Sequence, residues 1–409
     1  MAQSFSAKNY FKKIYSADVL VEFYRRHNIT ALFEITESTP RKNVVGIFMD
    51  FYTALPPEVK IPLEKELALI NSVSTKYTPL LLHSLLKEKK LPEITQLECT
   101  SPHDSVLYHY MFTRGVFDDI LFFHDFYSSR GYMLYEAHEV DIVAADLAMT
   151  ELTREFTRIA NKEDNATECD LVYKTLDGLL FLTMTFDGKP ILSAKRDAVT
   201  GEIDRTTTTR KQEQVKIVYL PKDKEVLISF TGSKYEKLLF LDTFLRIVCK
   251  SGYTGKEESF DLTSFLLEDF DFSKTNKGVP LLTWKIKGVT LSFGTSEKQK
   301  KKMKLMIPSS VQEYGIAPLR TTLLEIGVLP QLAHYKLENA SLMFSFTNAL
   351  KVDKSIQVVC SLSKNKSSLC PLFPYDRLAR TLLKQARIEQ GFVEPVKKEK
   401  DEMTKKWEV

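Results

Sequence analysis

"DLVYKTLDGLLFLTMTFDGKPILSAK", residues 170–195, is the stretch that decides the fold class, because the spacing of apolar side chains changes there. Before it, apolar residues recur every three to four positions, as on one face of a helix; within it they alternate, as in a strand. Two Asp-Gly pairs, Asp177-Gly178 and Asp187-Gly188, separate the β-prone runs, and Asp-Gly favours two-residue hairpin turns. The stretch therefore predicts a three-stranded antiparallel meander.

The part of the chain before this stretch predicts a helical domain at residues 1–165. Ser16 is a candidate N-cap, and Pro57 suits the first turn of a helix. Gly115 and Gly131 are placed to close two further helices. The apolar periodicity predicts helices over residues 16–28, 42–56, 57–73, 78–90, 101–115, 117–131 and 139–161.

The part that follows predicts a β-rich domain with covering helices at residues 166–392. Ser233 and Glu236 have the spacing of a helix capping box, directly after a predicted hairpin. Gly288 shifts the alternation within a strand, which predicts a β-bulge. Residues 196–214 predict a polar loop, and the charged residues 393–409 predict a disordered tail. The fold class is thus α+β. Strands are expected over 215–220, 225–230, 281–293, 302–307, 333–346 and 355–363, and helices over 233–250 and 374–390, the last ending before Gly391.

Composition limits the class of protein more than its function. The chain has 409 residues, enough for two domains, and its net charge of +4 is too small to indicate a polyanion partner by itself. The five cysteines form no CxxC motif, which fits a reducing cytoplasm. Nowhere do 18 apolar residues run together, so no membrane partner is expected.

Motifs for nucleotide cofactors and for common hydrolases are missing from the sequence. It contains no GxxxxGK[ST], GxGxxG, GxSxG or HExxH motif, and only 15 glycines. An ATPase, a Rossmann dehydrogenase and an α/β-hydrolase are therefore disfavoured, and we expect no cofactor.

A cluster of histidines and acids offers one enzymatic alternative. "HD" occurs at His103-Asp104 and again at His124-Asp125, and metal-dependent phosphohydrolases of the HD kind use such residues to hold a metal that activates water. His109, His124, Asp125 and Asp141 could serve as the metal ligands. The competing interpretation is structural: Asp104 begins a helix beside Ser101, and His124 packs among phenylalanines.

Lysines and arginines suggest a second alternative, sequence-independent binding of nucleic acid. The alternation of Met303, Leu305 and Ile307 with lysines predicts that the lysine run lies at a hairpin tip and on the outward face of its return strand. If the basic segments converged on one face, they could contact phosphates. The residues in question are Arg205, Arg210, Lys211, Lys298, Lys300, Lys301 and Lys302.

The order of the sequence blocks resembles a family of uncharacterised bacterial proteins of similar length. The resemblance rests on "AKNYFKKIYSADVLVEFYRRHNI" (7–29), "DFYTALPPEVKIPLEKELALIN" (50–71), "VKIVYLPKDKEVLISFTG" (215–232) and "SFDLTSFLLEDFDF" (259–272). It implies an accessory role in a mobile-element or anti-phage defence system, and it transfers no catalytic residue. The leading hypothesis from the sequence is a non-enzymatic cytoplasmic protein that binds a protein partner.

Overall fold

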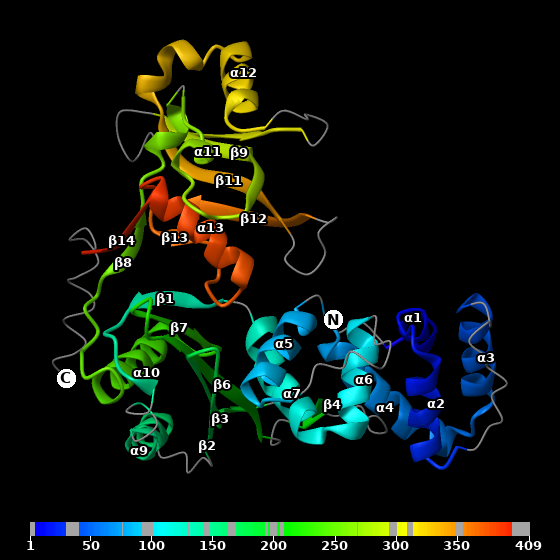
Figure 1. Cartoon of the computed structure of the whole chain (residues 1–409). Helices are drawn as coiled ribbons and strands as arrows, with labels where there is room; N and C mark the ends of the chain where they lie inside the picture. The colour runs from blue at the N-terminus through cyan, green and yellow to red at the C-terminus, as the bar shows by residue number, and fades with distance from the viewer. Residues whose placement is uncertain are drawn as a thin grey trace. The chain divides into compact units, whose positions relative to one another are not determined.

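The computed structural model describes residues 5–29, 41–75, 77–91, 101–129, 131–142, 145, 148–161, 169–192, 195–196, 203–204, 208–267, 269–293, 301–308, 314–347 and 355–394. The chain is an α+β protein, as predicted, with helices mostly in its N-terminal part and antiparallel sheets in its C-terminal part (Figure 1). Within the described ranges, no helix combines the length and the apolar character needed to cross a membrane.

The chain divides into two compact units. Unit 1 comprises Met1–Arg130 together with Lys174–Phe181, and unit 2 comprises Gly131–Tyr173 together with Leu182–Val409. The division falls earlier than the change of periodicity in the sequence. The helix of residues 149–160 belongs to unit 2, although its amphipathic pattern continues that of the preceding helices.

Unit 1 is a set of helices packed around aromatic side chains. Pro57 occupies the first turn of its helix, as predicted, and Pro62 lies inside the same helix. Gly115 does not close a helix: Thr113 ends one helix and caps the next, so Gly115 lies within the latter, which corrects the prediction. The helices are α1 (Ala7–Phe11), α2 (Ala17–Arg26), α3 (Arg41–Ala54), α4 (Pro57–Val73), α5 (Thr78–Glu88), α6 (Pro102–Phe112) and α7 (Arg114–Ser128).

The first predicted hairpin forms, and its tip belongs to unit 1. Asp177 and Gly178 both have positive φ, 52° and 73°, as a two-residue hairpin turn of this type requires. The ring of Phe181 lies 4.9 Å from that of Phe123 and 5.3 Å from that of Phe126. Aromatic packing therefore joins the hairpin tip to α7.

A five-stranded sheet has the strand order β1-β7-β6-β3-β2. Helix α10 (Lys234–Ile247) begins with the predicted capping box of Ser233 and Glu236. The rings of Phe240 on α10 and Phe156 on α9 (Met149–Ala160) are 5.0 Å apart, which packs the two helices together. The strands are β1 (Met133–Glu136), β2 (Cys169–Leu176), β3 (Leu179–Leu192), β6 (Thr208–Leu220) and β7 (Glu225–Phe230).

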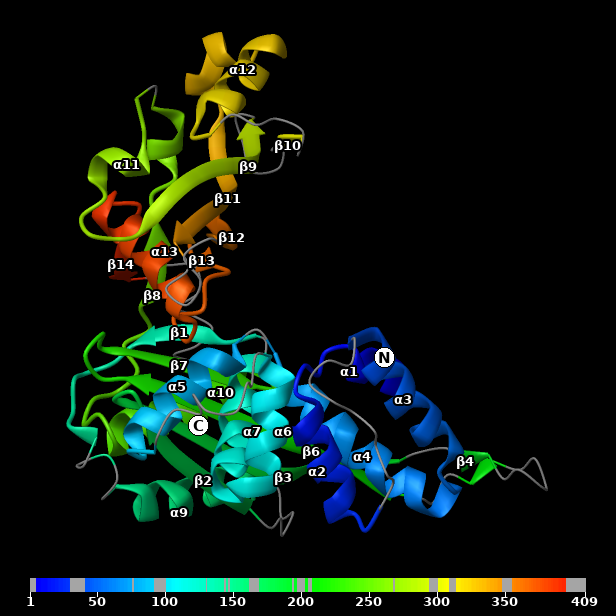
Figure 2. The ribbon, with the colours of Figure 1, turned by 45° about the vertical axis from the view of Figure 1, so that its right-hand side comes forward.

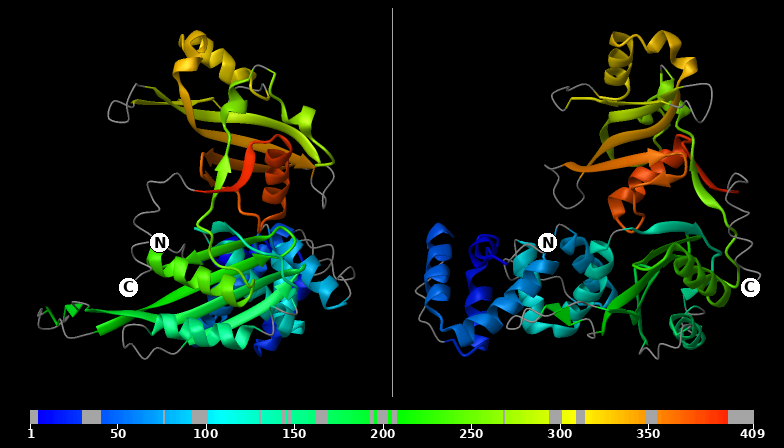
Figure 3. Two further views of the ribbon diagram at one scale, coloured as in Figure 1. Left: turned by 90° about the vertical axis from the view of Figure 1, so that its left-hand side faces the viewer. Right: turned by 180° about the vertical axis from the view of Figure 1, so that it is seen from behind.

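Two sequence predictions for this sheet are wrong. Strand β3 runs straight through Asp187-Gly188, so the second turn and the meander do not form. Part of the predicted polar loop is instead the start of β6 at Thr208 (β3 and β6 are green in Figure 3), and β4 (Lys195–Arg196) pairs with β5 (Ile203–Asp204). Long neighbouring strands continue their backbone pairing where local turn preference alone would end it.

A second five-stranded sheet has the order β10-β9-β11-β12-β13. Gly288 marks the predicted bulge, because the pairing of β9 with β11 skips one residue between Ile286 and Gly288. The strands are β9 (Leu281–Phe293), β10 (Lys301–Met306), β11 (Lys336–Thr347), β12 (Ser355–Ser363) and β13 (Lys366–Ser367). Around it lie η1 (Thr263–Leu266), α11 (Phe272–Thr275), α12 (Ala317–Glu325), η3 (Leu329–His334) and α13 (Pro374–Gln385).

Strands β8 (Glu257–Phe260) and β14 (Glu389–Val393) form a separate antiparallel pair. The sequence predicts that residues 386–390 belong to the last helix, but α13 ends at Gln385 and Arg387 turns the chain with a positive φ of 59°. Residues 395–409 lie outside the described residues, so the predicted disordered tail stays a prediction.

Candidate functional site

The basic residues proposed from the sequence are only partly described. Arg205, Lys298 and Lys300 lie outside the described residues, and Arg210 and Lys211 lie on β6 with undescribed side chains. The remaining two, Lys301 and Lys302, are exposed on β10. Met303 and Leu305 pack against the core, so Lys302 and Lys304 point to the opposite face, as the alternation predicted.

One face of the second sheet is covered. The buried cluster on this face includes one residue from each of the three central strands, namely Trp284, Leu342 and Cys360. It also includes Leu323 of α12 and Leu382 of α13. Figure 2 shows α11 and α13 on one side of strands β9, β11 and β12. The sheet therefore uses its inner face to build the core of this part of unit 2.

The other face, which we call the outer face, carries polar and exposed side chains, although Gly288, Ser292 and Ser345 on it are buried. Directly paired residues share a face of a sheet, so the register aligns its side chains in rows across the strands. The rows are Lys302–Ser292–Lys336, Lys304–Thr290–Asn339–Ser363, Met306–Gly288–Ser341–Ser361, Lys285–Met343–Val359 and Thr283–Ser345–Gln357.

Three large apolar side chains lie on the outer face, and we call them its apolar centre: Met306 at the end of the edge strand β10, and the directly paired Met343 and Val359. Met306 is 58% exposed and Val359 is 59% exposed, although both occupy regular strand positions. Met343 is half-buried directly beside Val359, and the small residues Gly288 and Ser341 lie in the neighbouring row. Since exposed apolar groups on a rigid sheet cost free energy in water, their clustering is typical of a binding surface.

Four lysines, which we call the rim, lie beside this apolar centre: three are in the two rows on one side of it, and Lys285 is in the row of Met343. Lys285, Lys302, Lys304 and Lys336 all lie in the rows of the outer face, and within the described residues none of them forms an ion pair. Glu338, which lies between Leu337 and Asn339 at a register shift, accepts a hydrogen bond of 2.8 Å from Ser292. The outer face thus combines exposed apolar side chains with a group of four lysines next to them.

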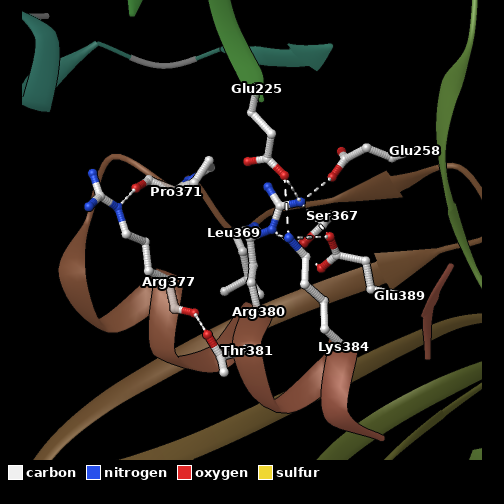
Figure 4. Close-up of polar contacts among 10 residues, drawn as sticks. All are labelled: Glu225, Glu258, Ser367, Leu369, Pro371, Arg377, Arg380, Thr381, Lys384 and Glu389. Atoms are coloured by element: carbon white, nitrogen blue, oxygen red, sulfur yellow. Dashed lines mark hydrogen bonds and ion pairs between the residues drawn. The ribbon is translucent and has the colours of Figure 1, made fainter. Parts of the chain in front are cut away.

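A second group of charges in unit 2 has the opposite character, because it is buried (Figure 4). The Arg380 guanidinium on α13 lies 2.6 Å from Glu389 on β14, 3.2 Å from Glu225 on β7 and 3.2 Å from Glu258 on β8. Lys384, one turn further along α13, lies 3.4 Å from Glu225 and 3.5 Å from Glu389. We call these five residues the Arg380 cluster.

Burial sets the protonation of the Arg380 cluster. Arg380 is only 5% exposed; burial, together with the neighbouring Glu389 and Glu225 carboxylates, raises the pKa of Glu258 to about 7, against the attraction of Arg380. The pKa of Glu225 is also raised by burial, although Arg380 and Lys384 oppose the shift. With three acids and two bases, a proton on Glu258 neutralises the cluster. All of its charges serve to join α13, β7, β8 and β14.

The first His-Asp pair is structural, as the alternative interpretation predicted. Asp104 is fully buried and forms the capping box of α6 with Ser101. Its Oδ1 accepts hydrogen bonds from the backbone N–H groups of Tyr15 (2.9 Å) and Ser16 (3.1 Å). The ring of His103 contacts Asn71 at 3.2 Å, and burial lowers its pKa to about 4.

The four residues considered as metal ligands lie in different surroundings. His109 is buried on α6 with its Nδ1 2.5 Å from the Thr113 hydroxyl, and burial lowers its pKa to about 4. His124 and Asp125 are half-buried neighbours on α7, whereas Asp141 is exposed and belongs to unit 2. Among the described residues, no group of three or more His, Cys, Asp or Glu side chains could hold a metal ion. The phosphohydrolase assignment gains no support and stays a prediction.

Reasoning from the sequence missed most of the outer face. The alternation in β10 located Lys302 and Lys304, but Met343 and Val359 lie on strands whose register with β9 is not visible in the sequence. Both residues alternate with buried ones, so the signal available was two outward-facing apolar residues on predicted strands.

No family model matches this chain, and no curated protein matches its sequence.

Proposed function

We propose that this chain is a non-enzymatic protein that binds a protein partner, and that the outer face of the second sheet is its binding surface. The single observation that carries the proposal is the exposure of Met306 and Val359 on one face of the sheet at regular strand positions, with Met343 paired to Val359. Protein interfaces combine apolar side chains with polar ones at their edge, and the outer face offers both kinds: three large apolar side chains and four lysines.

The structure of the sheet suits this role. The outer face is carried by strands whose inner side chains, such as Ile286 and Phe344, are fully buried. A rigid support keeps the side chains of a binding surface in place, so less entropy is lost when a partner binds.

The cellular setting is part of the proposal. The resemblance of the sequence blocks to bacterial proteins supports an accessory role in a defence or mobile-element system. Cysteine usage without CxxC motifs supports a cytoplasmic location.

Affinity capture from native cells tests the proposal when wild type is compared with two matched variants. Val359→Asp places a charge in the centre of the outer face. Leu324→Asp makes the same kind of change at a residue that is 60% exposed on α12. We expect Leu324→Asp to retain the stoichiometric partner and Val359→Asp to reduce its recovery at least tenfold, in nuclease-treated extracts.

Two results would contradict the proposal. One is equal recovery of the partner by both variants, which would place binding elsewhere. The other is loss of all captured material after nuclease treatment, which would favour the nucleic-acid alternative, whose binding weakens steeply with salt.

A further inference from the structure

We infer that the outer face binds an acidic amphipathic helix of its protein partner. This inference rests on the proposed function and names the chemistry of the partner: apolar side chains along one stripe of a helix, flanked by Asp and Glu. Three features support it: the width of the apolar centre, the positive charge of the rim lysines, and the kind of groups on a sheet face. A sheet face presents side chains, which pack against a helix, whereas a sheet edge presents backbone groups, which pair with a strand.

The size of the apolar centre matches a short helix. Met306 lies on β10 and Val359 on β12, so three strand spacings separate them in the order β10-β9-β11-β12. At about 4.8 Å per spacing the centre is about 14 Å wide. A helix covers that distance in about ten residues, with apolar side chains at i, i+3, i+4 and i+7.

The centre is also uneven in a way that suits side chains from a partner. Met343 and Val359 are paired directly, whereas Met306 lies in the neighbouring row, in which the next residues are Gly288 and Ser341. The Met306 side chain lies against Gly288, since its sulfur would be 2.9 Å from a Cβ there, and Met side chains adapt their shape to an apolar surface that approaches them.

The rim determines the charge of the partner. Lys285, Lys302, Lys304 and Lys336 are the rim cations, and their ion-pairing capacity is unused within the described residues. Acidic residues flanking the apolar stripe of a helix would meet these lysines, whereas basic residues would be repelled. A nucleic acid would satisfy the lysines but would leave the apolar centre without a partner, so the acidic helix fits the whole face better.

Site-specific photocrosslinking in native cells tests this inference on the full chain. A p-benzoylphenylalanine at Val359 reports what lies on the outer face, and the same residue at Leu324 is the control. We expect Val359 to crosslink, well above the Leu324 level, to a segment with net negative charge and helical apolar spacing.

The crosslinked segment, made as a labelled synthetic peptide, then measures the contribution of the rim. We expect the double variant Lys285→Glu, Lys304→Glu to weaken binding at least tenfold, and added salt to weaken wild-type binding. The double variant Lys222→Glu, Lys234→Glu changes the net charge equally at exposed positions outside the outer face and should bind like wild type.

The possible outcomes separate this inference from the proposed function. A neutral or basic segment crosslinked at Val359 would overturn the acidic-helix inference and leave the binding surface intact. Crosslinks to nucleic acid or to a second copy of this chain would overturn the inference as well. Crosslinking no stronger than at Leu324 would overturn both.

Discussion

Unit 2 contains two groups of charged side chains that differ in almost every respect. The Arg380 cluster is buried, and each of its members has an oppositely charged partner within 3.5 Å. The lysines of the outer face are on the surface and have no ion-pair partner within the described residues. The comparison separates the charges that stabilise the fold from those that remain available to bind another molecule.

Removing the central cation should have the largest effect. Arg380→Ala leaves Glu225, Glu258 and Glu389 buried without the guanidinium, and we expect it to lower the free energy of unfolding by about 3–5 kcal/mol. Lys384→Ala, which removes a half-exposed cation, should cost about 1 kcal/mol or less. Fluorescence of Trp284 during denaturant unfolding, in a Trp407→Phe background, reports on this unit.

An equal loss in the free energy of unfolding for Arg380→Ala and Lys384→Ala would contradict this prediction, because burial would then not determine how much each cation contributes.

The protonation of Glu258 should make the stability of unit 2 depend on pH. Its folded pKa of about 7 exceeds the ordinary value of 4.5, so the stability it contributes is present below pH 4.5 and is lost as pH rises through 7. The loss amounts to about 3 kcal/mol by the size of the shift. Glu258→Gln should flatten the decline in stability between pH 5 and pH 8. An unchanged slope in the variant would show that another group titrates.

The bulge that shapes the outer face can be tested separately. A Cβ at Gly288 would lie 2.6 Å from the Leu305 carbonyl oxygen and 2.9 Å from the Met306 sulfur. Gly288→Ala should therefore destabilise unit 2 by about 1–2 kcal/mol, by forcing these atoms apart. Gly252→Ala is the control, since its nearest neighbour is 3.8 Å away and no such strain arises. Equal stability of both variants would mean that the strand accommodates a side chain there.

The rim lysines should matter least for folding. Replacing Lys285 or Lys304 with Ala should change the free energy of unfolding by less than about 0.5 kcal/mol, as is usual for surface charges without partners. The same denaturant titration used for Arg380→Ala gives the comparison. A loss above about 1 kcal/mol would mean that these lysines stabilise the sheet and are not simply available for binding.

What the sequence could predict was local. Asp177-Gly178 and the Ser233–Glu236 capping box each set the backbone within four residues, and both form as expected. Asp187-Gly188 carries the same local signal as the first pair, but β3 continues through it because its pairing partners continue. Strand β1 was not predicted, since its four residues have no alternation long enough to recognise.

The two charge groups escaped prediction for a different reason. Glu225 and Arg380 are 155 positions apart, and nothing in either segment indicates the other. The outer face likewise depends on the register that places Met343 between Lys285 and Val359. Contacts of this kind arise from the packing of distant elements, so they become visible only in the folded chain.

Whether the outer face binds a protein partner is tested best by the crosslinking yield at Val359, compared with that at Leu324, in native cells. The two residues have almost equal exposure, 59% and 60%, so accessibility alone predicts equal yields. The account predicts a dominant protein adduct at Val359 that survives nuclease and disappears with Lys285→Glu and Lys304→Glu. Equal yields at both positions would contradict it, because the outer face would then be ordinary surface.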